Sequence, residues 1–417
     1  MTRTSVLVLR TFFMLGLAAA AACGPTTRGG GDDNGDGCVD TDGDGFTTCG
    51  GDCCDNTGLC ANPELVNPGA FDVPGNSLDD DCNGTLDDTA ALCDQGIASN
   101  TGDAMDFAKA IELCQTTTMG DVKWGVISAE LTLADGTGVP AGQSHAVRPK
   151  FGSTLVPHGG SSFALLSTGA AAGKGDTNPG YQDFEDVGDP GNGTESAFPS
   201  DFFAANGNKL PNAPGCPGPS GGKAEDPVML TLTIKVPTNA KSFKLETNCF
   251  SSEFPEYTCS PFNDFFVVLL DSGFAGTPAN PSDKNLAFYT PPNSTQKFPV
   301  GVNLAAGNTG LFTQCINGKT GCAPQAKAGT ISTCLGFDQL AGTGLDTAKS
   351  FECDTNSKEG GGTGWLTTSG NVNSGEIVKL RIAIWDTSDH VLDSIVAVDN
   401  FQWSLGVSDP GTVIFRR

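Results

Sequence analysis

Short runs of apolar residues in the second half of the chain predict β-strands. Residues 228–236 (VMLTLTIKV) and 378–385 (VKLRIAIW) alternate apolar and polar side chains, residues 265–270 (FFVVLL) predict a buried strand, and residues 395–403 predict another. Long loops rich in Gly, Pro, Asn and Ser separate these runs, and no helix of crossover length lies between them. The pattern therefore predicts a mainly β fold, an antiparallel, jelly-roll-like β-sandwich rather than an α/β enzyme fold.

One short helix is predicted at the start of this large domain. Residues 103–114 (DAMDFAKAIELC) place Met105, Ala108 and Ile111 near helical spacing behind an acidic cap. In contrast, residues 169–226 have low hydrophobicity, and we expect them to form a long surface excursion.

The amino-terminal residues resemble an export signal. A short basic start precedes the apolar residues 11–22 (TFFMLGLAAAAA), which are too few for a transmembrane span. The small residues stop at Cys23, so the segment resembles a bacterial lipoprotein signal in which Cys23 is lipidated. Ala20 stands where lipoproteins prefer leucine, which leaves ordinary cleavage open; Gly24 fits delivery to the outer membrane and cell surface of a Gram-negative bacterium.

Composition agrees with export. Sixteen cysteines indicate an oxidising compartment, and a lipidated Cys23 would leave an odd number for disulfides. Local spacing suggests three pairs, although sequence alone does not fix connectivity: Cys249 with Cys259, Cys315 with Cys322, and Cys334 with Cys353. A formal charge of −25 makes nucleic acid a poor partner and favours divalent cations.

The chain of 417 residues contains 56 glycines and 25 prolines, and these residues help to mark the boundaries between four parts. Residues 1–22 are the signal, residues 23–31 a flexible tether, residues 32–92 an acidic cysteine-rich module, and residues 93–417 the large β domain.

The acidic module carries the clearest chemistry. No lysine or arginine occurs from residue 29 to residue 108, a stretch that holds 18 of the 48 acidic residues. Within it, Asp40, Asp42 and Asp44 alternate and Gly45 follows, which matches positions 1, 3 and 5 of a calcium loop. Residues 32–37 (DDNGDG) repeat this spacing weakly. Carboxylates crowded in this way without basic residues predict a bound Ca²⁺.

A family resemblance appears in the large domain. Residues 251–270 (SSEFPEYTCSPFNDFFVVLL), 165–169 (LLSTG) and 382–401 (IAIWDTSDHVLDSIVAVDNF) resemble the choice-of-anchor L domain of bacterial surface proteins. The resemblance spans roughly residues 94–407. It implies a protein fastened to a cell surface, while the family's molecular activity is not established.

The module resembles the metal-binding motif repeats of such surface proteins, with DTDGDGF at residues 40–46 and NPGAFDVPGNSLDDDCNG at residues 67–84. It departs from them at Asp72, where glutamate is common, and from an EF-hand loop at Gly51, which stands in place of the bidentate glutamate. Further acids can complete the sphere or hold a second ion: Asp52, Asp55, Asp79, Asp80 and Asp81. The alternative is a solvated acidic linker held by disulfides.

The motifs of the large domain contain a second group of acids, namely Glu253, Asp264, Asp386, Asp389 and Asp393, with Asn263 beside them. If they converge at one edge of the sandwich they form a candidate second cation site. The alternative is that several of them cap turns, because Asp and Asn side chains accept backbone N–H bonds there.

Motifs for catalysis are scarce. The three histidines, His145, His158 and His390, have no zinc-ligand spacing, and no HExxH or GxSxG motif occurs. The leading hypothesis is therefore a noncatalytic, calcium-binding surface lipoprotein whose sandwich binds a polysaccharide or a matrix protein. The alternative is a secreted, glycosidase-like hydrolase that uses acidic residues of the sandwich.

Overall fold

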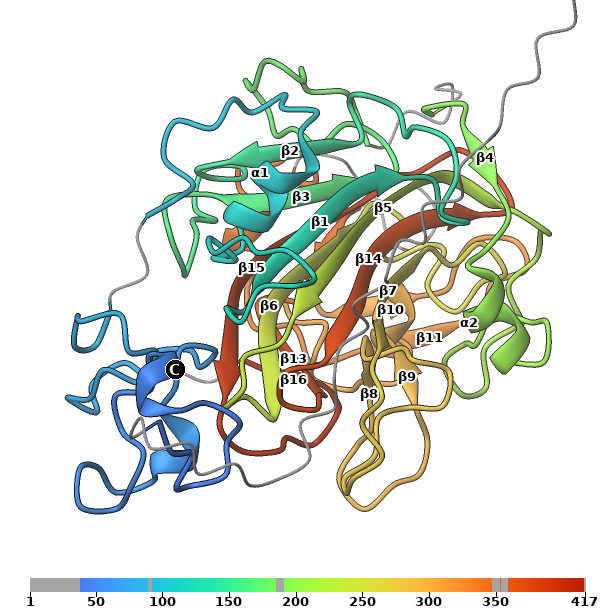
Figure 1. Cartoon of the computed structure of the whole chain (residues 1–417). Coiled ribbons are helices and arrows are strands. Elements are labelled where there is room, and N and C mark those ends of the chain that lie inside the picture. Colours follow the sequence, from blue (N-terminus) through green and yellow to red (C-terminus); the bar gives the residue numbers. More distant parts are fainter. Residues whose placement is uncertain (1–37, 89–91, 185–190, 347–352, 354–358, 416–417) are drawn as a thin grey trace, which may run out of the picture.

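The structure is a computed structural model that describes residues 38–88, 92–184, 191–346, 353 and 359–415 (Figure 1). It is mainly β, with antiparallel sheets and few helices, as the sequence predicts. The signal and tether, Cys23 and residues 32–37 lie outside the described residues.

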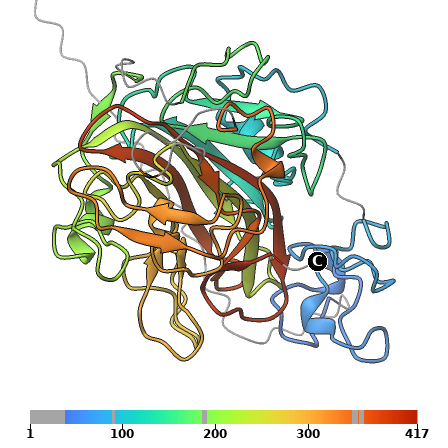
Figure 2. The same ribbon diagram turned by 180° about the vertical axis from the view of Figure 1, so that it is seen from behind.

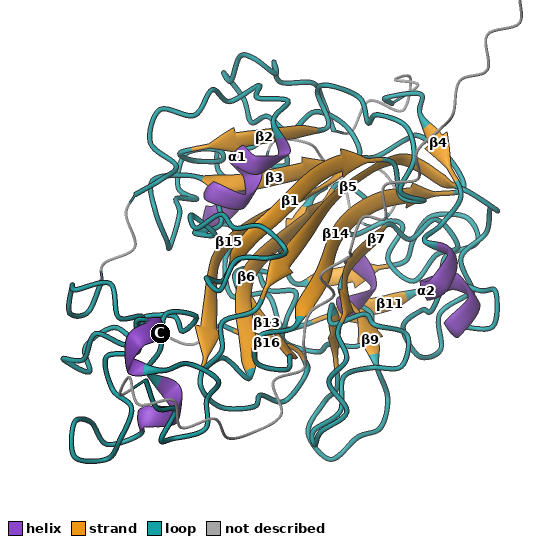
Figure 3. Ribbon diagram, in the orientation of Figure 1, coloured by secondary structure: helices purple, strands orange, loops and turns teal. Residues whose placement is uncertain are grey.

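The first sheet contains three of the four strands expected from the sequence. In spatial order its strands are β1 (Gly125–Thr132), β5 (Ala224–Lys235), β14 (Ile377–Thr387) and β7 (Phe265–Asp271), and β4 (Glu195–Ser196) pairs with β5. The long central strand β14 pairs with β5 on one side and with β7 on the other (Figure 3).

The second sheet contains the fourth expected strand, β15. Its spatial order is β16 (Gly411–Ile414), β13 (Leu366–Asn371), β6 (Ser242–Ser251), β15 (Ser394–Ser404), β3 (Phe163–Ser167) and β2 (His145–Arg148), and β12 (Gly361–Gly362) pairs with β6.

The main core lies between the two sheets. Alternate residues of β5 and β14, such as Leu232 and Ile382, meet inward residues of the second sheet, such as Leu245 and Val396. Each of these side chains is fully buried, and burying one contributes about 1.5–3 kcal/mol. The alternation read from the sequence thus sets which face of each strand forms the core.

The outer face of each sheet is also covered. On the first sheet, Trp385 of β14 stacks on Phe265 of β7 with ring centroids 5.7 Å apart, and helix α2 (Ser200–Ala205) packs Phe202 into the same cluster. Loop residues such as Phe151 cover Phe250 on the second sheet. The expectation of a surface excursion over residues 169–226 is wrong in part, because this segment supplies α2 and several of the covering side chains.

The predicted amino-terminal helix is present as α1 (Ala104–Lys109), with Asp103 accepting a hydrogen bond from the Met105 amide at its start. It is shorter than the sequence suggests, because Glu112 has a left-handed backbone (φ 68°). Ile111 nevertheless remains buried in the main core.

Short elements complete the described fold. They are the pairs β8 (Phe288–Tyr289) with β9 (Phe298–Pro299) and β10 (Gly318–Thr320) with β11 (Gly329–Ile331), and the 3₁₀ turns η1 (Thr48–Gly50), η2 (Pro63–Leu65), η3 (Val302–Leu304) and η4 (Asp338–Leu340). Figure 2 shows the orange segment with β10 and β11 crossing the back of the sandwich.

The three cysteine pairs suggested by local spacing are wrong. In the described part of the chain seven disulfides form instead: Cys38–Cys49, Cys53–Cys82, Cys54–Cys60, Cys93–Cys114, Cys216–Cys259, Cys315–Cys334 and Cys322–Cys353. Among the described cysteines Cys249 is the free thiol, and burial in the core raises its pKa. The odd cysteine expected from the composition is therefore a core residue of β6.

The acidic module docks on the turn between β5 and β6 (blue in Figure 1). Thr238 donates its amide to the Gly69 carbonyl at 2.9 Å, and Asn239 exchanges two hydrogen bonds with the backbone of Phe71. The Phe71 side chain packs against the main core. The module is thus joined to the sandwich by specific contacts.

Candidate metal centre in the acidic module

The loop that begins at Asp40 turns sharply because two of its glycines adopt left-handed backbone angles, with φ 83° at Gly43 and φ 94° at Gly45. Their amides donate to the Asp40 carboxylate at 2.7 and 3.2 Å, and the Asp44 amide donates to Asp42 Oδ1 at 3.1 Å. The alternating sequence therefore folds into a tight turn that points its acids the same way.

Five carboxylates converge at this turn. One oxygen each from Asp40, Asp42 and Asp55 lie within 4.8 Å of one another, and so do oxygens of Asp42, Asp44 and Asp52. Asp42 belongs to both sets. The structure thus brings Asp52 and Asp55 to the loop, as the sequence predicts.

Two oxygens of this cluster have no hydrogen-bond donor although they are buried. They are Asp42 Oδ2 and Asp52 Oδ2. Asp52 is only 6% exposed, and its other oxygen accepts the Cys54 amide at 2.9 Å. Asp55 is fixed by Thr41, which donates its amide and its hydroxyl. A buried carboxylate oxygen without a donor is costly, so the arrangement leaves room for a positive partner.

The electrostatics agree with this geometry. The pKa of Asp44 is raised to about 6, mainly by burial and also by repulsion from Asp42 and Asp52, against the lowering effect of hydrogen bonds from Phe46 and Asn67. Burial and the neighbouring aspartates also raise the pKa of Asp42. A cation bound among these oxygens would remove that repulsion. Five carboxylates without sulfur or imidazole form a donor set for a hard cation.

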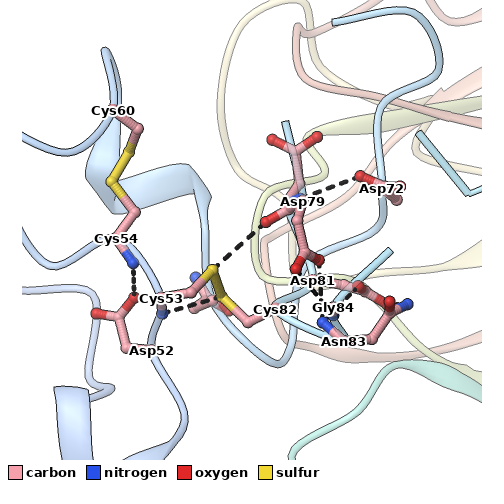
Figure 4. Close-up of a disulfide and its surroundings, with 12 residues drawn as sticks. Asp52, Cys53, Cys54, Cys60, Asp72, Asp79, Asp81, Cys82, Asn83 and Gly84 are labelled. Carbon is pink, nitrogen blue, oxygen red and sulfur yellow. Dashed lines mark hydrogen bonds between the residues drawn. A yellow bond between two sulfur atoms is a disulfide. The ribbon is translucent and has the colours of Figure 1, made fainter. Parts of the chain in front are cut away.

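Disulfides hold the cluster from both sides. Cys38–Cys49 closes the loop around the alternating aspartates. Cys53–Cys82 and Cys54–Cys60 lie beside Asp52 (Figure 4). These bonds fix the backbone that carries the ligand candidates without using an extended hydrophobic core.

The other predicted metal ligands of the module have local structural roles. Asp79 accepts the amides of Asn83 and Gly84, and Asp81 also accepts the Asn83 amide (Figure 4). Asp80 accepts from the Val73 amide and from the Asn76 side chain. In the described part of the chain, these three aspartates are not in the groups whose oxygens converge. They stabilise turns, as Asp side chains commonly do.

Asn67 is a residue that the sequence analysis did not single out. Its Nδ2 donates to Asp44 Oδ2 at 2.9 Å, and its Oδ1 accepts from the Thr238 hydroxyl at 2.6 Å. It is fully buried. Asn67 therefore joins a ligand candidate to the large domain; its position in an Asn-Pro-Gly turn was the available signal.

The second predicted cluster also assembles, inside the sandwich. Asp264 and Asp386 place their carboxyls in contact, and Asp264 Oδ2 accepts the Ser394 hydroxyl at 2.5 Å. Glu253 Oε2 accepts the Asp264 amide at 3.4 Å. Asp386 is 1% exposed, and neither of its oxygens accepts an N–H or a hydroxyl. Burial raises the pKa of all three carboxyls, and repulsion by neighbouring carboxylates adds to the effect. Two such carboxyls must share a proton or a cation.

The remaining members lie at the edge of this cluster. Asp389 caps a turn by accepting the Val391 amide, and its half-buried carboxyl repels Glu253 and Asp264. Asp393 lies against Gly169 and accepts the Thr168 hydroxyl. Thus both readings of the sequence apply, because some of these acids converge and others cap turns.

Comparisons with known proteins do not extend this picture. No protein-family model, curated protein or solved structure matches the chain. Among the described residues, no helix has the length and apolar character that crossing a membrane requires.

Proposed function

We propose that this chain is an exported, noncatalytic surface protein in which a calcium ion organises the acidic module that carries the β-sandwich. The observation that carries the proposal is the convergence of Asp40, Asp42, Asp44, Asp52 and Asp55, with two buried oxygens that lack donors. Calcium takes six to eight oxygen ligands in flexible geometry, which suits five carboxylates on one irregular loop. Its affinity would be modest, with a Kd on the order of 10⁻⁴–10⁻³ M as in extracellular modules.

The surface location is supported by three features. The amino terminus resembles a lipoprotein signal ending at Cys23. Seven disulfides require an oxidising compartment. Finally, pairing of the described cysteines leaves only Cys249 over, so Cys23 is not needed as a disulfide partner there. In this proposal the lipid anchors the chain to the outer membrane, and the sandwich meets a polysaccharide or a surface or matrix protein.

Burial of the acids favours binding over the alternative of glycoside hydrolysis. Glu253, Asp264 and Asp386 are at most 5% exposed, so their carboxyls do not reach a sugar at the surface. A hydrolase needs one acid and one base in contact with the glycosidic bond. Because these acids are buried, they suit a structural role better than a catalytic one. The proposal therefore includes a second, structural cation held by Asp264 and Asp386.

Calorimetric titration of the oxidised full chain with CaCl₂ tests the module site. We expect binding heat in the parent protein and a large loss of affinity in Asp42→Asn and Asp44→Asn. Glu64→Gln is the matched control, because it removes one exposed charge from the same module. Equal binding by the parent and both aspartate variants would overturn the assignment.

A further inference from the structure

We propose that the β domain holds a divalent cation between the carboxylates of Asp94 and Glu112, at a site separate from those above. This goes beyond the proposed function and does not depend on the module binding metal. Both residues lie next to one disulfide, Cys93–Cys114: Asp94 follows its first cysteine, and Glu112 precedes its second by two residues. The bond therefore holds the two segments together.

Two glycines provide the space between the acids. A Cβ atom on Gly160 would lie 2.7 Å from Glu112 Oε1 and 2.8 Å from Asp94 Oδ2, and one on Gly159 would lie 2.5 Å from Glu112 Oε2. Both carboxylates thus approach the same glycine, whose φ of 53° also disfavours a side chain. Only residues without side chains admit the two acids at this point.

Three oxygens of this pair are buried and accept no hydrogen bond of normal geometry. Asp94 is 3% exposed, and its Oδ2 accepts the Ser161 amide and the Ser162 hydroxyl, both at 2.7 Å. Its Oδ1 accepts none of these, and neither does Glu112, although the nearby Asn400 backbone amide lowers the pKa of Glu112. The Asp94 side chain is therefore held in place through Oδ2, the oxygen that lies beside Gly160, as a metal ligand is held by a supporting shell.

The surroundings are negative as well. Glu246 and Asp399 repel Glu112, and His158 pairs with Glu246. Asp399 accepts the amides of His158, Gly159 and Asn400. Within the described residues, no lysine or arginine forms an ion pair with any of the four acids. Against the opposing effect of burial, hydrogen bonds from Ser162 and Ser161 lower the pKa of Asp94, but no described lysine or arginine balances the charge of the pair.

The protonation equilibrium of Glu112 reflects this environment. Burial raises the pKa of Glu112 to about 9, and repulsion by Asp399, Asp94 and Glu246 contributes. The ligand that fits is a hard cation, since the available atoms are carboxylate oxygens. We assign calcium, because its flexible coordination accepts two side chains together with carbonyl or water oxygens.

Luminescence of Tb³⁺, a lanthanide that replaces calcium, provides the test. The Trp365 ring lies 4.6 Å from the ring of His158, which directly precedes the two glycines beside the acids, so Trp365 is close enough to transfer excitation to an ion at this site. The measurement uses the full chain carrying Asp42→Asn, Asp44→Asn and Asp386→Asn, which removes the module site and the second cation proposed at Asp264 and Asp386. We expect Trp-sensitised emission that CaCl₂ displaces and that falls at least tenfold in Glu112→Gln and in Trp365→Phe.

The controls separate binding from folding. Glu130→Gln makes the same chemical change at an exposed position of β1 and should leave the emission unchanged. Near-ultraviolet circular dichroism checks that each variant is folded, and Asp94→Asn provides a second removal of a ligand. Emission that is absent from the parent background, or that persists in folded Glu112→Gln, would refute the site.

Discussion

At the scale of single residues, Asp52 distinguishes a metal ligand from a structural acid. Its Oδ2 is buried without a donor, so Asp52→Asn should be neutral or stabilising when EDTA removes calcium, because it relieves repulsion within the cluster. In excess CaCl₂ the same change should destabilise the module and weaken calcium binding about tenfold or more. Thermal unfolding with and without calcium measures the direction of the change in stability under each condition. Destabilisation of equal size under both conditions would mean that Asp52 only supports the turn.

The buried pair Asp264 and Asp386 allows a similar distinction. If a proton joins the two carboxyls, Asp386→Asn should preserve the contact and change stability by less than about 1 kcal/mol, whether or not calcium is present. If a cation joins them, as proposed, the variant should lose a calcium-dependent gain in melting temperature that persists in protein lacking the module site. Asp389→Asn is the control, because Asp389 caps a turn at the edge of the cluster.

At the scale of elements, helix α2 is tied to the first sheet by charge. Asp201 accepts two bonds from Arg381 of β14, at 3.0 and 2.6 Å, and one from Lys284 at 2.7 Å. The Arg381 side chain is largely buried, whereas about a third of Asp201 is exposed, which weakens the pairing through solvent screening.

We expect Asp201→Asn to cost about 1 kcal/mol at neutral pH. Hydrogen bonds from Arg381 and Lys284 hold the pKa of Asp201 below its ordinary value of 3.8. A carboxyl with a lowered folded pKa stabilises the fold above its unfolded pKa and loses that contribution as the pH falls. The difference between parent and variant should therefore be full at pH 7 and shrink below about pH 4. Urea unfolding at several pH values measures it, and a pH-independent difference would contradict the ion-pair explanation.

The sequence predicted the strands better than the cysteine pairs, for a physical reason. Alternation along residues 228–236 and 378–385 is a local property. Strand β5 contains residues 228–235 of the first run and β14 contains all of the second, with the expected faces buried. Cys216 and Cys259 lie 43 residues apart, and only the packing of loops over the sheets brings them together. Local spacing does not contain that information.

The same distinction applies to the candidate sites. The alternating acids Asp40, Asp42 and Asp44 were visible because their spacing is local. The Asp94–Glu112 pair was not, because a disulfide and two glycines from a different segment create it. Two separate features of the sequence could have indicated this pair, namely an acid next to a cysteine and a Gly-Gly pair.

At the scale of the whole molecule, Asn67 links the metal centre to the placement of the sandwich. It contacts Asp44 through Nδ2 and Thr238 through Oδ1, while the neighbouring Phe71 amide donates to Asn239. Ordering the loop around calcium should therefore strengthen docking, since the same side chain has fixed partners on both sides.

Asn67→Ala should weaken calcium binding about tenfold, as loss of a partner that orients a metal ligand does. It should also abolish the slowing of hydrogen exchange that we expect calcium to cause at the Phe71 amide, because docking and ion binding are then uncoupled. Thr238→Val is the matched control: it leaves the bond to Asp44 and should retain most of the calcium affinity while raising exchange at Phe71. If Asn67→Ala binds calcium like the parent and exchange at Phe71 responds to calcium as before, the module and the sandwich are connected without being coupled.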